Sequence, residues 1–338
     1  MQILVVGAGL AGATAARMLA DSGHSVDVID SRYHIAGNAY DFVLDNGIRV
    51  HKYGPHIFHT KNEKVWNFVQ QYSKFIPYRH MVQALLKNGK YVPFPPNKAT
   101  KAFVPHENIV DVFYRPYTKK MWGVPLEEVA PSILARVPGR DDYVDIYFPD
   151  DPYQGMPVQG YEQLVRNMLN HRNITVYTNT SYDHNMNDTY DHVFHSGSID
   201  EYYEYELGVL DYRCIDFNVV EIPAFHKILP TTTINFTDPA VPYTRVTEWS
   251  HFPNSSSLSN STILTYETPR AAQEKVREDR FYPIQNDRNK SLYQEYRKLH
   301  KEHSSNVTFI GRSGQYVYLD MDQAINSTMA KIEKFLAL

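Results

Sequence analysis

The chain has 338 residues, 43% hydrophobic and 21% charged, a balance typical of a folded globular protein with a substantial core. A net charge of −4 lacks the basic excess of nucleic-acid-binding proteins, so we expect no nucleic acid partner. The single cysteine, Cys214, rules out an intramolecular disulfide and argues against a cysteine metal site, and we expect no metal. Without a secretory signal or an apolar stretch of ~20 residues, we expect a cytoplasmic protein with no membrane partner.

The N-terminal segment predicts a dinucleotide-binding βαβ unit. Apolar residues 2–6 predict a strand, residues 13–22 a helix, and residues 25–29 a second strand that ends at Asp30. Glycines stand at 7, 9 and 12 between the first strand and the helix. An acid about twenty residues after this glycine pattern is typical of the Rossmann fingerprint.

Each residue of this pattern has a physical reason. Gly7 permits a tight turn, Gly9 lets backbone N–H groups approach a pyrophosphate, and Gly12 allows close helix–strand packing. The helix N-terminus stabilises negative charge, and Asp30 can accept hydrogen bonds from a ribose. The alternative is a βαβ unit that binds nothing.

Further elements follow in chain order. The patterns predict β-structure with a turn at 45–47 (41–60), a helix (61–75), a hairpin with its tip at 87–90, an aromatic helix (107–122), a strand-and-loop stretch (136–154) and a helix (160–169). After these come short strands and turns of a substrate-binding sheet (173–245), a strand (307–310) and a C-terminal helix (321–338).

The glycine pattern alone does not separate NAD from FAD. Behind the ribose acid stand Arg32 and then Gly37 and Asn38, which resemble the second phosphate-facing segment of glutathione-reductase-type flavoproteins. Gly311-Arg312, followed by Met321 at the start of the last helix, resembles the segment that closes the FAD site in that fold class. The resemblance implies FAD as cofactor.

Ordered sequence blocks resemble those of UDP-galactopyranose mutases over nearly the whole chain. They are HKYGPHIFHT (51–60), YTKKMWG (117–123), YQGMP (153–157), INFTD (234–238), VPYTR (241–245), FYP (281–283) and the segment 311–321. The resemblance implies an α/β fold with a glutathione-reductase-type FAD domain, a small, truncated helical domain and an antiparallel substrate-binding sheet. It divides the chain into FAD domain (1–75), reduced helical domain (76–135), mixed substrate region interleaved with the FAD domain (136–300) and FAD domain again (301–338).

The function that the resemblance implies is a non-redox isomerisation between UDP-galactopyranose and UDP-galactofuranose, as used in galactofuranose biosynthesis. In the family mechanism FAD acts reduced, as FADH−, and its N5 displaces UDP from the anomeric carbon to give a covalent flavin–sugar adduct. The sugar ring opens and recloses with the 4-hydroxyl before UDP returns. The implied partners are a UDP-sugar and a reductant, either NAD(P)H or reduced flavin.

Three residues match catalytic positions of the family. Arg136 and Arg245 stand at its two diphosphate-binding arginines, with Arg136 on or beside a mobile loop, and arginine's planar fork suits phosphate. His56 matches a histidine near the reactive face of the flavin. It tunes N5 or moves a proton, or it fixes its loop through hydrogen bonds.

The remaining site residues are implied around the substrate. Each tyrosine taken alone, among the 26 in the chain, is more often a packing residue. Asp320 either holds the site's polar network or caps the last helix, and both roles are compatible. The family positions are Tyr147, Tyr282 and Tyr318 at the diphosphate, Tyr117 and Trp122 around uridine and sugar, and Asn235 and Asp320 near substrate.

The chain also departs from the family pattern. Between Pro96 and Tyr117 it lacks several helical turns found in bacterial members, so we expect a monomer or an atypical homodimer. Asp322, Leu319 and Gln159 replace usual residues and leave the sugar open, with UDP-N-acetylgalactosamine and UDP-arabinose as alternatives.

Two other classes of function stay open at this point. One is a flavin oxidoreductase of the amine-oxidase or dehydrogenase type, although an apolar amine pocket would not need phosphate-directed arginines. The other is a protein that binds a nucleotide sugar or flavin without turnover.

Overall fold

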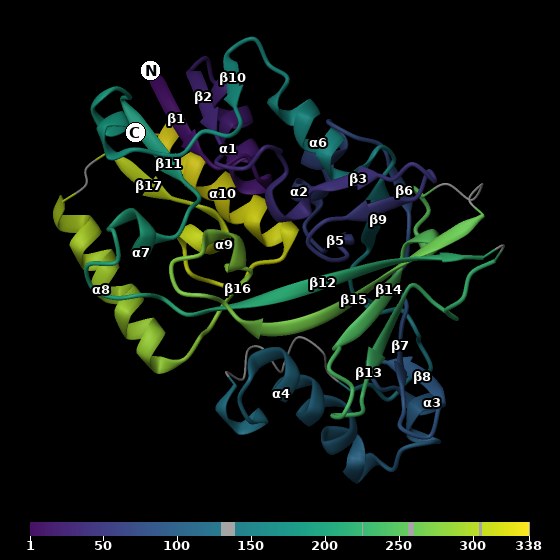
Figure 1. The fold of residues 1–338 in the computed structure, drawn as a ribbon. Coiled ribbons are helices and arrows are strands. Elements are labelled where there is room, and N and C mark those ends of the chain that lie inside the picture. The colour runs from purple at the N-terminus through teal and green to yellow at the C-terminus, as the bar shows by residue number, and fades with distance from the viewer. Residues whose placement is uncertain (130–138, 225, 256–259, 304–305, 338) are drawn as a thin grey trace.

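The computed structural model describes residues 1–129, 139–224, 226–255, 260–303 and 306–337. Its first layer is a parallel sheet (Figure 1). The strand order is β10 (Ile174–Tyr177), β2 (Ser25–Ile29), β1 (Gln2–Val6), β11 (His192–His195) and β17 (Val307–Phe309).

The side chains of β1 serve two cores, one on each face of this sheet. Ile3 and Val5 belong to one buried cluster, whereas Leu4 and Val6 belong to another. Successive side chains alternate between the two faces because a strand is pleated. A parallel sheet with apolar side chains on both faces must be covered by other elements on each face.

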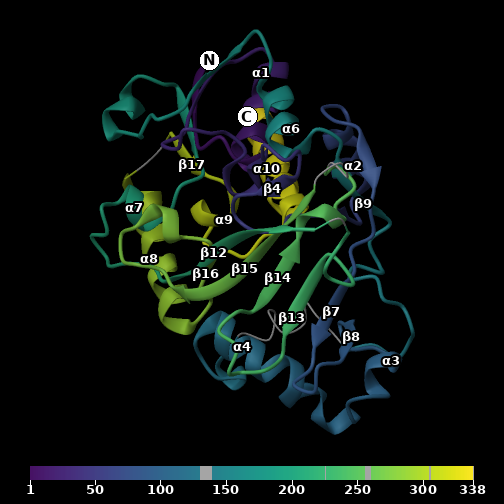
Figure 2. The same cartoon turned by 45° about the vertical axis from the view of Figure 1, so that its right-hand side comes forward.

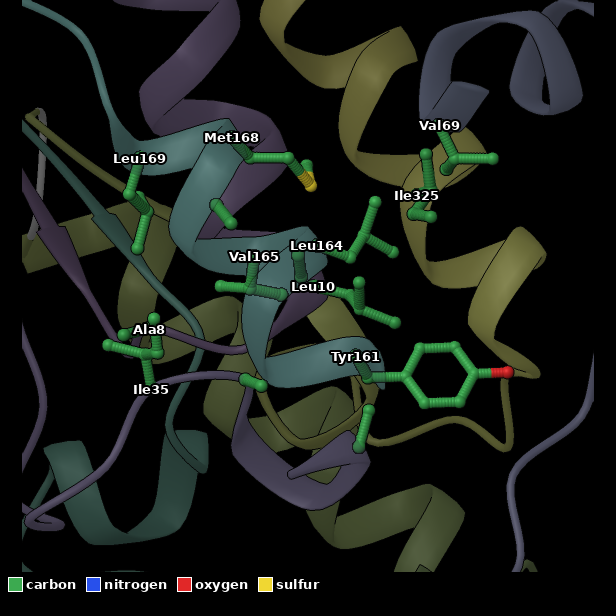
Figure 3. Close-up of a cluster of buried hydrophobic side chains, with 14 of the residues drawn as sticks. Ala8, Leu10, Ile35, Val69, Tyr161, Leu164, Val165, Met168, Leu169 and Ile325 are labelled. Carbon is green, nitrogen blue, oxygen red and sulfur yellow. The ribbon is translucent and has the colours of Figure 1, made fainter. Parts of the chain in front are cut away.

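Helices cover both faces of the parallel sheet. The first cluster takes side chains from α1 (Leu10–Asp21), α2 (Glu63–Gln70), α6 (Gly160–Leu169) and α10 (Met321–Leu336). In Figure 3, Leu164 of α6, Leu10 of α1 and Ile325 of α10 lie in this cluster. The second cluster takes side chains from α7 (Ile199–Tyr202) and α8 (Asp287–His303).

A second sheet of seven strands extends away from these helices (Figure 2). Its order is β16 (Tyr282–Pro283), β12 (Tyr212–Pro223), β15 (Ser261–Ala271), β14 (Arg245–Glu248), β13 (Thr233–Phe236), β7 (Val82–Leu85) and β8 (Tyr91–Phe94). All neighbouring pairs are antiparallel except β7 with β13, which is parallel. A small helical lobe lies along this sheet (Figure 2). Its helix α3 (Lys98–Lys101) packs beside β8, whereas a short π-helix (Val110–Tyr114) leads into α4 (Arg115–Trp122), which packs against β15.

Smaller elements connect the two sheets. A hairpin pairs β3 (Asp41–Val43) with β4 (Arg49–His51), and a three-stranded sheet has the order β5 (Phe58–Thr60), β9 (Tyr153–Pro157) and β6 (Phe75–Pro77). A 3-10 turn covers Gly37–Ala39, and the short helix α9 covers Gly311–Gly314.

These elements confirm the predicted fold class and correct some details. The turns at 45–47 and 87–90 join paired strands as predicted. The helix predicted over 61–75 ends at Gln70, and residues 75–77 are a strand. The assignment of all strands within 173–245 to the substrate sheet was wrong for β10 and β11. Both join the parallel sheet, because strand pairing is decided between distant segments.

Among the described residues, no helix is long and apolar enough to cross a membrane.

Truncating Leu164 tests the first core cluster. This side chain is fully buried between α1 and α10, so Leu164→Ala should lower the free energy of unfolding by about 2–5 kcal/mol. The measurement is urea denaturation, followed through the loss of helical circular dichroism. Leu336→Ala, at a side chain 38% exposed, is the control and should change it by about 0.5 kcal/mol or less. Equal effects of the two variants would contradict the packing described.

Candidate active site

The glycine turn before α1 is held by close backbone contacts. A Cβ on Gly12 would lie 1.8 Å from the carbonyl oxygen of Gly7, so only glycine fits there. Gly7 has a φ of +99° and also has no room for a side chain. Asp30 accepts hydrogen bonds from the backbone N–H groups of Ala8 (2.8 Å) and Arg32 (2.9 Å), which ties the turn to the end of β2.

A second turn lies directly against the first. Gly37 has a φ of +55°, and a Cβ there would lie 2.9 Å from the Cα of Gly9. Arg32 donates to the side-chain oxygen of Asn38 at 2.9 Å, and its guanidinium lies 4.8 Å from the ring centroid of Tyr53. The two predicted phosphate-facing segments therefore form one surface.

That surface lines a cavity, which we call the glycine-turn cavity. The predicted residues on its wall are Gly7, Gly9, Asp30, Gly37, Asn38, His56, Arg312, Asp320 and Met321. No side chain caps the N-terminus of α1 among the described residues, which leaves backbone N–H groups at the cavity wall for a phosphate. This donor set and the glycine cradle fit the pyrophosphate of a dinucleotide such as FAD.

A second cavity, which we call the tyrosine cavity, lies between the seven-stranded sheet and α4. The predicted residues on its wall are His56, Tyr117, Trp122, Tyr147, Asn235, Arg245, Tyr282, Arg312, Tyr318, Asp320 and Met321. Tyr117 and Trp122 come from α4, and Asn235, Arg245 and Tyr282 come from the seven-stranded sheet. The remaining residues come from α9, α10 and the connections between elements.

Four residues line both cavities. They are His56, Arg312, Asp320 and Met321. Asp320 also caps α10, since it forms a capping box with Gln323, whose side chain accepts from the Asp320 N–H at 3.0 Å. Both roles considered for Asp320 are thus compatible with its position. A dinucleotide bound at the glycine turn would extend into the tyrosine cavity past these four residues.

Arg245 carries the central charge of the tyrosine cavity. Its Nε atom lies 2.8 Å from a carboxylate oxygen of Glu267, which is 1% exposed on the neighbouring strand β15. Burial opposes the charge of Arg245, but the carboxylate of Glu267 outweighs it and holds the pKa of Arg245 above its usual value. The guanidinium is therefore a permanent cation inside the cavity.

Arg312 and two tyrosines form a stack at the junction of the cavities. The rings of Tyr282 and Tyr318 are stacked with centroids 5.5 Å apart, and the Arg312 guanidinium lies 5.0 Å from the Tyr318 centroid. Arg312 also donates to the carbonyl oxygens of Leu319 (3.0 Å) and Phe281 (3.2 Å). Burial raises the pKa of Tyr282 and of Tyr117, so both hydroxyls keep their protons and can donate hydrogen bonds.

His56 is a neutral imidazole. Its Nδ1 lies 2.7 Å from the carbonyl oxygen of Gly54, which can only accept, so Nδ1 carries the hydrogen and Nε2 does not. Burial lowers the pKa of His56 to about 3, helped by the nearby His51. A histidine in this state accepts a hydrogen bond through Nε2 and does not take up a proton near pH 7.

The structure thus brings the predicted residues together, with two exceptions. Gly12 packs behind the glycine turn and does not line the cavity. Arg136 lies outside the described residues. Placement in a cavity leaves the role of each residue a prediction.

Sequence reasoning missed several cavity residues. Glu267 and His80 line the tyrosine cavity, and Arg277, Arg280 and Glu201 line the glycine-turn cavity. For Glu267 a weak signal exists, because it is the single acid in the strand 261–271, and an acid that is buried needs a partner.

Comparison with known proteins decides the family. A family model described as UDP-galactopyranose mutase matches residues 112–318, more than half of the chain, and a model for an NAD(P)-binding Rossmann-like domain matches residues 5–72. The chain belongs to the UDP-galactopyranose mutase family. It is therefore assigned as an isomerase, and the Rossmann-like domain together with the mutase family indicates a flavin cofactor.

Individual relatives agree with this family over nearly full length. A probable UDP-galactopyranose mutase of Klebsiella pneumoniae is 35% identical, covering 99% of this chain and 94% of the relative. A dTDP-fucopyranose mutase of Escherichia coli is also 35% identical, covering 97% and 96%. The crystal structure of a reduced UDP-galactopyranose mutase shares the fold, with a TM-score of 0.76 and 15% identity over 99% of this chain and 94% of that one.

Buried histidines make the stability of this UDP-galactopyranose mutase family member pH-dependent. Burial lowers the pKa of His51, His56 and His80 to about 3 from the usual 6.5. Their contribution is fully present above pH 6.5 and is lost as the pH falls, because only the unfolded chain takes up these protons. The free energy of unfolding should fall by up to about 1.4 kcal/mol per pH unit for each histidine.

Denaturation at pH 6 and at pH 4.5 measures this loss. His80→Gln should weaken the pH dependence relative to the unsubstituted protein, because one buried titrating group is removed. His303→Gln, at an exposed histidine, should leave it unchanged. The same pH dependence in His80→Gln and His303→Gln would show that His80 is not held neutral.

Proposed function

We propose that this protein interconverts UDP-galactopyranose and UDP-galactofuranose with bound, reduced FAD and without net oxidation. The observation that carries the proposal is the junction of a dinucleotide-type cavity with a cavity that contains the paired cation Arg245 and several tyrosines. An uncharged amine substrate would have no use for this cation. The proposal is therefore favoured over an oxidoreductase of the amine-oxidase type.

The diphosphate of the substrate would bind at Arg245. A guanidinium donates several hydrogen bonds in one plane, and the Nε atom of Arg245 lies 2.8 Å from a carboxylate oxygen of Glu267. Tyr282 and Tyr318 stand across the same cavity, and Tyr147 closes it near His80, with ring centroids 5.8 Å apart. We assign Arg136 to the same diphosphate only because it stands at the position of a diphosphate-binding arginine of the family.

The base and the sugar would lie beside α4. Tyr117 and Trp122 project from this helix into the cavity, and Trp122 meets Tyr282 edge to face at 6.5 Å. Flat rings of this kind stack on a pyrimidine base. Asn235 lies opposite Arg245 in the β13–β14 hairpin and reaches the same space.

The residues that would hold FAD are those of the glycine-turn cavity. The N–H groups at Gly9 and the start of α1 suit the pyrophosphate, Asp30 suits the ribose, and Arg312 and Met321 stand where the cofactor enters the tyrosine cavity. Reduced flavin supplies a nucleophile, N5, for the anomeric carbon when it is bound. The reductant that we propose is NAD(P)H or reduced flavin.

His56 would act on the cofactor as a hydrogen-bond acceptor. Its Nδ1–H is committed to Gly54, and its low pKa makes a proton transfer through it unfavourable near pH 7. Of the roles considered, we therefore disfavour proton shuttling. Tuning of the flavin through Nε2 and fixing of the loop through the bond to Gly54 are compatible with each other.

A second candidate substrate is dTDP-fucose. A relative named dTDP-fucopyranose mutase is as similar to this chain as the UDP-galactopyranose mutase compared with it. The two substrates differ by the methyl group of thymine, by the 2′-hydroxyl that deoxyribose lacks and by the 6-hydroxyl that fucose lacks. A single methyl group changes discrimination by only about 1–3 kcal/mol, whereas a hydroxyl that the site hydrogen-bonds changes it by much more.

Incubation with UDP-galactofuranose under dithionite tests the reaction. We expect conversion to UDP-galactopyranose, detected by chromatography of the UDP-sugars, and little conversion without reduction. Absence of conversion under reduction, or equal conversion by the oxidised protein, would refute the proposal. The same assay with dTDP-fucose, UDP-N-acetylgalactosamine and UDP-arabinose ranks the substrates.

Removal of the central cation tests the role of Arg245. Arg245→Ala should lower kcat/KM under dithionite by roughly a hundred-fold, since about two charge-assisted hydrogen bonds are lost. The flavin should remain bound, as judged by its absorbance after gel filtration. Arg288→Ala, at an arginine whose side chain is 61% exposed, is the control and should keep normal activity. Loss of flavin from Arg245→Ala would instead assign Arg245 to the cofactor.

A further inference from the structure

The ammonium group of Lys120 joins helix α4 to the β13–β14 connection (residues 237–244). Lys120 stands in the last turn of α4 and is half-buried. Its Nζ atom donates to four backbone carbonyl oxygens: Phe236 (2.7 Å), Tyr243 (2.9 Å), Asp238 (3.3 Å) and Val241 (3.4 Å). An ammonium has three hydrogens. Two of them serve the short bonds to Phe236 and Tyr243, and the third is shared between Asp238 and Val241.

Three of these carbonyls belong to the connection, and the fourth, that of Phe236, ends β13 just before it. Phe236 donates its N–H to the carbonyl oxygen of Thr244 at 3.0 Å, and just beyond this pair Asn235 stands opposite Arg245. Both of these side chains line the tyrosine cavity. The path of the β13–β14 connection therefore determines where Asn235 and Arg245 lie.

Helix α4 forms the opposite wall and is anchored separately to β12. Arg213 donates to the carbonyl oxygens of Met121 (2.7 Å) and Lys120 (3.2 Å) at the end of the helix. Tyr117 projects from this helix into the cavity. Through Lys120, the helix that carries Tyr117 is bonded to the hairpin that carries Arg245.

Lys120 does not itself line the tyrosine cavity. A partly buried charge is expensive for stability, and an apolar side chain of similar size would pack there at lower cost. Unlike an apolar side chain, the ammonium binds four backbone carbonyl oxygens and so fixes the position of the connection relative to α4.

We propose that Lys120 is a positioning residue that sets the affinity for the nucleotide diphosphate by fixing the β13–β14 connection against α4. The inference rests on the proposed function in one respect, namely that Arg245 and Tyr117 hold the same nucleotide.

The charge of Lys120 gives this role a pH signature. Burial lowers the pKa of its ammonium to about 8, while Asp238 of the connection raises it. Arg213, which contacts Lys120 from β12, keeps its charge throughout this range. Below pH 8 the ammonium holds the connection, and above pH 8 its charge is lost.

The test compares UDP binding in two lysine variants of the same helix. Lys120→Met should raise the Kd for UDP about ten-fold in the flavin-loaded protein at pH 7, measured by calorimetry. Lys119→Met removes an exposed lysine one residue away and should leave the Kd within two-fold. Lys120→Arg, which keeps the charge, should recover part of the affinity.

A pH series separates positioning from general stabilisation. Between pH 7 and pH 9, the UDP affinity of the unsubstituted protein should fall more steeply than that of Lys120→Met, which lacks the titrating ammonium. Equal Kd values for Lys120→Met and Lys119→Met, or a flat profile in the unsubstituted protein, would overturn the inference. The pH profile of the unsubstituted protein decides the inference even if Lys120→Met fails to fold.

Failure of the proposed function gives a different result. If the unsubstituted protein binds UDP but converts no sugar, the mutase proposal fails, and the Kd comparison still decides the role of Lys120. If it does not bind UDP, both fail together.

Discussion

The pairing of β12 with β15 is the constraint on which the site depends. Eleven residue pairs run from Arg213 opposite Ala271 to Pro223 opposite Ser261. This ribbon connects β16, which carries Tyr282, to β14, which carries Arg245. A shift of one residue in either ladder would turn these side chains to the other face of the sheet, so one register aims them all into one cavity.

The charges of the site follow from burial and from nearby partners. Glu267 is buried on β15 and paired with Arg245, and both members of this ion pair line the tyrosine cavity. The hydroxyls of Tyr117 and Tyr282 and the imidazole of His56 are neutral because burial disfavours their charged forms. The cavity therefore offers the guanidinium groups of Arg245 and Arg312 together with neutral hydrogen-bond donors, and a diphosphate can bind to both kinds of group.

The two cavities meet where two distant parts of the chain come together. His56 lies in the segment between β4 and β5, Arg312 lies in α9, and Met321 begins α10. This meeting point allows a cofactor held by local backbone geometry at Gly7 and Gly9 to reach a substrate held by long-range contacts. The topology thus separates the proposed cofactor site in the glycine-turn cavity from the proposed substrate site in the tyrosine cavity.

Local features of the sequence determined the glycine turn, the strand that ends at Asp30 and the family blocks, because each depends on neighbouring residues in one short segment. Most candidate site residues could be named for the same reason, since they stand inside such blocks. Only the tertiary structure decided that β10 and β11 join the parallel sheet, and that Glu267 pairs with Arg245. It also decided that Lys120 donates hydrogen bonds to backbone carbonyl groups more than a hundred residues away. Such contacts depend on which distant strands and helices meet, and no local pattern of residues encodes that choice.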